Sequence, residues 1–315
     1  MHPALIVLTA CLFALPYRAQ VDQSDSSALK TLFLIQNQAD RLFKNPSVKI
    51  QTASHDSLVA ALEFILQCKD PLILPWDSLK SHFSVLIPAN RRLLLITWNL
   101  PERNECNRYY GFLWQQATFK KNHFWQRKKN TTEALPSFVY RLHENTNWLK
   151  QKSPELYTGS AEQWPGMLYT AIVPANGYYL LLGWNGKDAY TQFKGIDVLW
   201  FDAEHQPHFG KPVFKIPKKN PKRMLFEYSK EAQMSLRYDP WSRRVIYSHL
   251  GPRDENPALL GQFAFYGPDG SFDALNERDN RWILEEAIDV RNKRSKLDNA
   301  PKPDTEQQIQ LYPIK

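Results

Sequence analysis

The second half of this chain consists of short apolar segments that follow one another closely and are separated by turn-forming residue pairs. Such pairs favour the tight turns that join neighbouring antiparallel strands. Short strands joined in this way form an antiparallel meander. The pattern predicts an α+β chain that is mainly β, folded as a curved sheet, a barrel or a partial propeller-like sheet, although no fixed repeat period is present. The turn pairs are Asn176-Gly177, Asn185-Gly186, Asp239-Pro240 and Asp269-Gly270. The expected strands are SFVYRLHEN, GMLYTAIVP, YYLLLGW, GIDVLWFD, KPVFKIP, RMLFEYS, MSLRYD, RVIYSHL, GQFAFYGP and RWILEEAID.

The segment GIDVLWFD is apolar on both of its faces. Ile196 and Val198 alternate with Leu199 and Phe201, and alternate residues of a strand point to opposite sides of its sheet. We therefore expect this strand to be covered on both sides. Asp197 lies among these hydrophobic residues and needs a polar partner if it is buried.

Two amphipathic helices are expected ahead of the strands. Residues 24–43 carry apolar side chains at three- and four-residue spacings. The segment 55–68, HDSLVAALEFILQC, shows the same spacing and is expected to begin at Asp56 or Ser57. A first hairpin over residues 83–100, FSVLIPANRRLLLITWNL, follows these helices.

The first twenty residues, MHPALIVLTACLFALPYRAQ, have the composition of a signal peptide. Residues 4–15 form an apolar run that is too short to cross a bilayer, and the small residue Ala19 follows Pro16. We expect export to the periplasm or the medium. The sequence LTAC offers a second interpretation, in which Cys11 becomes a lipidated N-terminus. No later stretch is apolar enough to span a membrane, so none is expected in the mature chain.

The composition divides the chain into four expected parts. These are a signal peptide (1–20), an N-terminal helical segment with the first β-hairpins (21–135), an antiparallel β domain (136–292) and a flexible polar tail (293–315).

The net charge of +8 is spread over scattered basic residues rather than one dense patch. A positive chain attracts anionic partners, but dispersed charge gives no reason to expect a specific nucleic acid. The partners that remain are an envelope protein, an anionic polymer or a glycan.

Two cysteines remain after residue 20. Cys68 and Cys106 could pair in an oxidising compartment, or stay as two thiols, because sequence alone does not show their separation.

The sequence contains no motif for nucleophilic, nucleotide or metal chemistry. A strained serine elbow, a phosphate-binding loop and a dinucleotide fingerprint are all missing. His205 and His208 are separated by a proline and lack an acidic partner at a useful spacing, which indicates a loop and not a metal site. We predict no catalytic residue, no metal and no cofactor.

A hydrolase would need two carboxylates that flank one bond. The acids that stand out are Asp269 and Asp273, in an expected turn, and the adjacent Glu285 and Glu286. No pair among them can be selected from the sequence.

Aromatic residues beside turns are the best candidates for a ligand platform. Trp184 and Asn185 lie at one turn, with Asp188 and Tyr190 shortly after it, and Trp241 follows Asp239-Pro240. An aromatic ring beside amides and acids suits the stacking of a sugar. The same position also suits packing against a neighbouring strand, so the hairpin can be scaffold with only its tip exposed.

The segments YYLLLGWNGKD, KGIDVLWF, GKPVF, RMLFEYS, MSLRYD, RVIYSHL, GQFAFYGPDGSFDAL and RWILEEAIDVRN, between residues 178 and 292, resemble a family of uncharacterised exported proteins of Bacteroidota. The resemblance implies export and a shared fold and supplies no activity. We therefore expect an exported, envelope-associated protein that serves as a non-catalytic structural or interaction module. The alternatives are a carbohydrate-binding module and a hydrolase.

Overall fold

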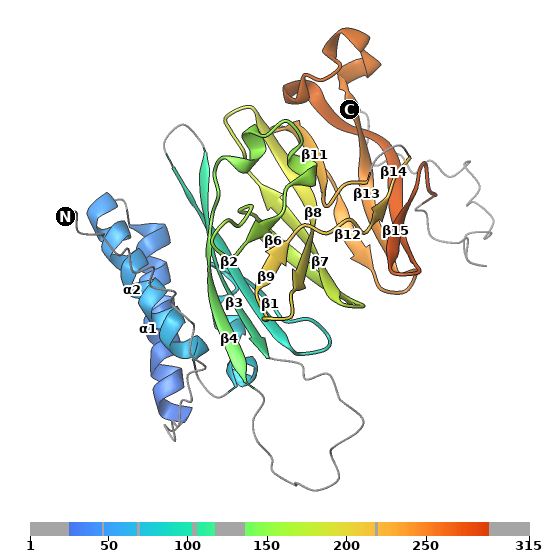
Figure 1. Cartoon of the computed structure of the whole chain (residues 1–315). Coiled ribbons are helices and arrows are strands. Elements are labelled where there is room, and N and C mark those ends of the chain that lie inside the picture. Colours follow the sequence, from blue (N-terminus) through green and yellow to red (C-terminus); the bar gives the residue numbers. More distant parts are fainter. Residues whose placement is uncertain are drawn as a thin grey trace, which may run out of the picture.

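The computed structural model describes residues 25–45, 47–67, 70–102, 106–116, 136–217 and 220–289. These residues form four layers, which lie from left to right in Figure 1: a pair of helices and then three β-sheets. The fold class expected from the sequence is confirmed, and the three sheets stay open rather than closing into a barrel. No helix in the described part of the chain is long and apolar enough to cross a membrane.

The helical layer consists of α1 (Asp25–Lys44) and α2 (Val48–Leu66), which pack against each other. The start expected for the second helix was wrong, because α2 begins at Val48 and not at Asp56 or Ser57. Ser57 lies inside the helix and its hydroxyl donates to the carbonyl of Ala53 one turn earlier. A serine that bonds back to the preceding turn is compatible with a helix interior, so its capping tendency was misleading.

The first sheet covers the inner side of the helices. Its order is β1-β2-β3-β4, with β1 at Ser84–Leu86, β2 at Leu93–Pro101, β3 at Asn107–Gln116 and β4 at Ser137–His143. Trp98, Phe112 and Trp114 of this sheet share one apolar cluster with Leu62 and Ile65 of α2. Strand pairing between β3 and β4 crosses the division expected between residues 135 and 136.

The second sheet has the order β5-β9-β8-β7-β6, and β11 pairs with β8 beside this path. The bounds are β5 Gly159–Ser160, β6 Leu168–Ala175, β7 Tyr178–Asn185, β8 Thr191–Phe201, β9 Pro207–Phe209 and β11 Met224–Ser229. The third sheet has the order β10-β15-β14-β13-β12. Its bounds are β10 Phe214–Lys215, β12 Leu236–Asp239, β13 Arg244–Pro252, β14 Tyr266–Arg278 and β15 Arg281–Glu285.

Stacking of the three sheets explains why so many strands are apolar on both faces. Leu199 of β8 belongs to the cluster between the first and second sheets. Ile196 and Val198 belong to the cluster that joins the second and third sheets. β8 is therefore covered on both sides, as its sequence predicts, and the burial of its apolar side chains stabilises two interfaces at once.

Several local expectations need correction. The segment GQFAFYGP is not a strand at its start, because Phe263–Phe265 form the short 3-10 helix η8 and β14 begins only at Tyr266. Asp269-Gly270 does not form a turn between strands but lies inside β14. The connection after Asn185 spans five residues instead of two, since β8 begins at Thr191. One strand pair, β10 with β15, is parallel.

Three expectations fall outside the described residues. They are the signal peptide with Cys11, Cys68 of the possible disulfide with Cys106, and the polar tail from residue 293.

Candidate functional site

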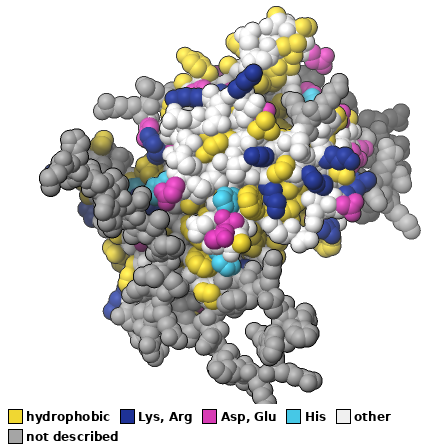
Figure 2. Space-filling model, viewed as in Figure 1, with side chains coloured by type: hydrophobic (Ala, Val, Ile, Leu, Met, Phe, Trp, Pro, Cys, Tyr) yellow, Lys and Arg dark blue, Asp and Glu magenta, His cyan; other side chains and the backbone are white. Residues whose placement is uncertain are grey.

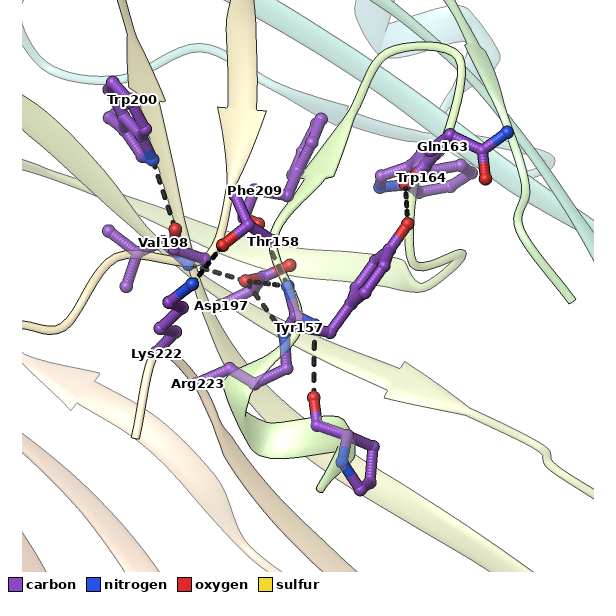
Figure 3. A network of polar contacts seen from close by, with 12 residues as sticks. Tyr157, Thr158, Gln163, Trp164, Asp197, Val198, Trp200, Phe209, Lys222 and Arg223 are labelled. Atoms are coloured by element: carbon purple, nitrogen blue, oxygen red, sulfur yellow. Dashed lines mark hydrogen bonds and ion pairs between the residues drawn. The ribbon is translucent and has the colours of Figure 1, made fainter. Parts of the chain in front are cut away.

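Among the described residues, Asp197 and Arg223 are fully buried charged side chains and form an ion pair with each other (Figure 3). Both side chains are fully buried, and both Nε and Nη2 of Arg223 lie within 3.2 Å of the same carboxylate oxygen. The Arg223 guanidinium also lies 4.9 Å from the ring centroid of Trp148. Tyr169 donates its hydroxyl proton to the other carboxylate oxygen of Asp197.

This network joins parts of the chain that are far apart in sequence. Arg223 also donates to the carbonyl of Phe209 in β9, and Lys222 donates to the hydroxyl of Thr158 (Figure 3). Every polar atom of the pair faces protein and not solvent, so we assign it to the scaffold.

The surface of the described chain is hollowed between the edge strand β11 and the β13–β14 pair. Two hollows lie there, of about 470 Å³ and about 240 Å³, and Tyr266 lines both of them. We call the two hollows together the β11 groove. A cavity with aromatic walls and a few polar groups is the usual form of a ligand site.

A β-bulge shapes the smaller hollow. Ser248 pairs with Phe272 and Leu250 with Pro268, so three residues of β14 stand opposite the single residue His249. Gly270, in the middle of these three, has a φ of 96°, which a side chain would disfavour. Bulges are common beside functional sites because they re-aim neighbouring side chains.

The bulge brings two carboxylates to His249. Nδ1 of His249 lies 2.8 Å from Oδ2 of Asp273, and Nε2 lies 4.0 Å from Oδ2 of Asp269. The hydrogen bond to Asp273 raises the pKa of His249 above its usual value, although partial burial acts against it. Oδ1 of Asp273 is also used, since it accepts the backbone N–H of Ala287. Asp273 therefore holds the imidazole in place and leaves Nε2, on a half-exposed ring, for a ligand.

Aromatic rings line the rest of the β11 groove. Phe226 of β11 packs against Tyr247 of β13 with the ring centroids 4.4 Å apart, and Phe263 meets Tyr266 edge-on at 5.1 Å. Phe263 and Phe265 are 39% and 41% exposed, which leaves ring surface open to a ligand. Both belong to η8. This short helix ends the segment that stands out from the sheets at the top of Figure 1. Figure 2 shows hydrophobic side chains on that segment.

The predicted hairpin tip is built into the scaffold. Asn185 donates its side-chain N–H to the carbonyl of Gly166, and the N–H of Gly186 donates to the hydroxyl of Tyr109 in β3. Asp188 accepts the backbone N–H groups of Tyr190 and Thr191 and so shapes the connection.

The aromatic residues of the tip differ in exposure. Trp184 is partly buried and donates its indole N–H to Gln192, whereas Tyr190 is 75% exposed. Lys187 contacts Glu227, which lines the smaller hollow, so the tip borders the β11 groove without forming it.

Trp241 lies apart from the other four predicted residues. It is 96% exposed in the turn between β12 and β13, at the opposite end of β13 from His249. Whether Trp241 has a structural role or contacts a ligand stays a prediction.

A second buried acid lies beneath the tip. Glu144 accepts the backbone N–H of Tyr109, and burial raises its pKa to about 7. Its side chain is only 8% exposed and does not line the β11 groove.

No protein-family model, no curated protein and no solved structure matches this chain. The resemblance to exported Bacteroidota proteins therefore stays a prediction, and the function rests on the geometry alone.

Little in the sequence points to the β11 groove. Asp269 and Asp273 were noted as acids in an expected turn, but their common partner His249 lies on another strand. The spacing of Asp269 and Asp273 was a usable signal, because residues four apart on a strand share a face and two acids can then lie close together.

Proposed function

We propose that this protein is an exported, envelope-associated, non-catalytic binding module and that it holds a glycan in the β11 groove. The proposal rests on one observation: half-exposed aromatic rings and oriented polar groups line the same groove. The sugar-facing parts are the rings of Phe263, Phe265 and Tyr266 and the imidazole of His249.

Aromatic rings and sugars suit each other because the C–H face of a pyranose is apolar and flat. Covering this face with an aromatic ring removes apolar area from water, which contributes about 25 cal/mol per Å². The hydroxyl groups at the rim of the sugar need donors and acceptors, which Nε2 of His249 and the carboxylate of Asp269 supply at the bulge. The fixed position of His249, held by Asp273, reduces the entropy lost when it binds.

Two features favour binding over hydrolysis. Asp269 and Asp273 both lie against the imidazole of His249 and not across a gap where a bond could be cleaved. Hydrolysis of a glycoside requires the two carboxylates to flank the sugar itself, whereas here both contact the same imidazole. Asp273 is also nearly buried, and each of its two oxygens already has a protein partner, which leaves little of the carboxylate accessible to a substrate.

Export is proposed from the composition of residues 1–20 alone. An exported binding module would meet glycans at the cell envelope.

The test is a glycan array probed with the purified chain, followed by titration calorimetry of the best ligand. Replacing both Phe263 and Phe265 by Ala is expected to weaken binding at least tenfold, which corresponds to about 1.4 kcal/mol, because it removes the apolar ring area that the sugar would bury. Trp241→Ala is the matched control: it removes an aromatic ring that is more exposed but lies outside the groove, and it should leave the affinity unchanged.

Tyr190→Ala separates the groove from the hairpin tip. If Tyr190→Ala or Trp241→Ala abolished binding while the double phenylalanine variant bound normally, the groove would be the wrong site. An array without any ligand would contradict the proposed function.

A further inference from the structure

The larger hollow of the β11 groove carries an excess of negative charge. Its lining includes the acids Glu231, Asp254, Glu255 and Asp269 and one basic residue, Arg253. The chain as a whole has the opposite sign, with a net charge of +8. On the face shown in Figure 2, Lys and Arg side chains are interspersed with acidic and hydrophobic ones.

Within the described part of the chain, the acids of the hollow form no ion pairs with Lys or Arg side chains. Arg253 forms no ion pair there, and Asp269 approaches only the imidazole of His249, at 4.0 Å, which pairs with it when the imidazole is protonated. Hydrogen bonds from the backbone and hydroxyl of Ser271 hold the pKa of Asp269 below its usual value against the effect of partial burial. The carboxylate is therefore charged at neutral pH.

Two of the acids occupy an unusual backbone conformation. Asp254 and Glu255 are consecutive non-glycine residues with φ of 54° and 52°. Each left-handed non-glycine residue costs about 1 kcal/mol or more and persists only where the surroundings enforce it. Here the strained pair places its side chains at the wall of the hollow.

Aromatic rings stand among these acids. Phe265 and Tyr266 line the same hollow, and the face of an aromatic ring attracts a cation. A ligand that combines an apolar sugar face with a positive group would satisfy the rings and the carboxylates together. A neutral glycan would stack on the rings and donate hydroxyl hydrogen bonds to a carboxylate, but it would leave the negative charge of the hollow unbalanced.

We infer that the glycan recognised by the β11 groove carries free amino groups, so that its ammonium groups lie among Glu231, Asp254, Glu255 and Asp269 while its sugar rings stack on Phe265 and Tyr266. This inference rests on the proposed function and specifies the class of its ligand.

The experiment compares two ligands that differ only in charge. A glucosamine tetrasaccharide and its fully N-acetylated counterpart are titrated into the intact protein by calorimetry, at about pH 6, where the amines are protonated and the carboxylates, with usual pKa values near 4, stay ionised. The best neutral ligand from the array forms a third arm. We expect the amino form to bind at least tenfold more tightly than the acetylated form.

Charge variants locate the effect. Glu231→Gln combined with Asp254→Asn keeps the shape of both side chains and should weaken only the amino ligand, by about threefold to tenfold, because exposed pairs contribute modestly. Glu162→Gln, an exposed acid outside the lining of the groove, is the matched control and should have no effect. Raising the salt to about 1 M should remove most of the preference, since it shortens the screening length to about 3 Å.

The outcomes separate the two claims. Equal binding of the amino and acetylated ligands would overturn the inference and leave glycan binding in place. So would binding of the array ligand alone. Loss of binding in the charge variants for both ligands alike would also overturn it, because the acids would then act through structure and not through charge. If no glycan bound, the proposed function would fall and the inference with it.

Discussion

Replacing Arg223 by Met tests the role assigned to the buried ion pair. Methionine has a similar length and keeps the apolar contact with Trp148, but it leaves the Asp197 carboxylate fully buried with only Tyr169 and the N–H of Val198 as donors. A buried charge that loses its partner typically costs about 3–5 kcal/mol. Because total stability is about 5–15 kcal/mol, the variant should lose a large share of it.

The double variant Asp197→Asn with Arg223→Met removes both charges and should recover part of the loss. Asparagine keeps an acceptor for the Tyr169 hydroxyl. The loss of unfolding free energy in the double variant should be smaller than the summed losses of the two single variants. We expect the difference to be about 2 kcal/mol or more, which is the coupling expected for residues of one network.

The assay is urea unfolding followed by tryptophan fluorescence, with Arg243→Met as the matched control. Arg243 also lies against a carboxylate, that of Glu277 at 2.6 Å, but its side chain is 68% exposed. Because solvent reaches this guanidinium, removing the pair should cost clearly less than removing the fully buried one, although the Glu277 side chain is only 13% exposed. If Arg223→Met cost no more than Arg243→Met, or if the losses at Asp197 and Arg223 were additive, the network would not act as a buried unit.

Two further predictions concern protonation. In an NMR titration His249 should show a pKa above its usual value, and Asp273→Asn should lower it, because the hydrogen bond to Asp273 is the main cause of the shift; an unchanged pKa would contradict the geometry of the bulge. Since the folded pKa is the higher one, this contact stabilises the protein fully below about pH 6.5 and its contribution is lost as the pH rises through the folded pKa. The pH dependence due to Glu144 has the same sign, because burial raises its pKa to about 7 in the folded protein. The contribution of Glu144 to the free energy of unfolding is therefore fully present below about pH 4.3 and is lost as the pH rises towards 7. Glu144→Gln should therefore flatten the pH dependence of the free energy of unfolding between these values, measured by urea unfolding, and an unchanged slope would show that Glu144 ionises freely in the fold.

Local sequence patterns were sufficient to predict most of the secondary structure. The alternation around Asp197 predicts a strand covered on both faces, and it also shows that a buried acid needs a partner. It does not identify Arg223, which lies 26 residues further along and reaches Asp197 only after β8 and β11 have paired.

The errors share a physical cause. Asp269-Gly270 suits a turn and a bulge equally well, because both need a glycine at positive φ. The choice between them depends on the length of β13 on the opposite side, which is tertiary information. The same holds for Asp56 and Ser57, whose side chains are compatible with a cap and with an exposed helix interior.

The candidate site was the least predictable part. Its walls come from β11, β13, β14 and η8, which belong to two different sheets and an irregular segment. The hairpin tip was predicted as a ligand site because its aromatic and amide side chains are adjacent in sequence. In the structure, Asn185 and Asp188 mainly hold the backbone in place. Residues that line the β11 groove together lie as far apart in sequence as Phe226 and Asp273.

Hydrogen–deuterium exchange with and without the tightest glycan from the array tests the central claim most directly. Binding in the β11 groove predicts slower exchange at the amides of residues 249–272, which include His249, η8 and the bulge, with little change at the 186–190 tip or the turn around Trp241. Protection confined to the tip or to that turn, with the groove unchanged, would contradict the account.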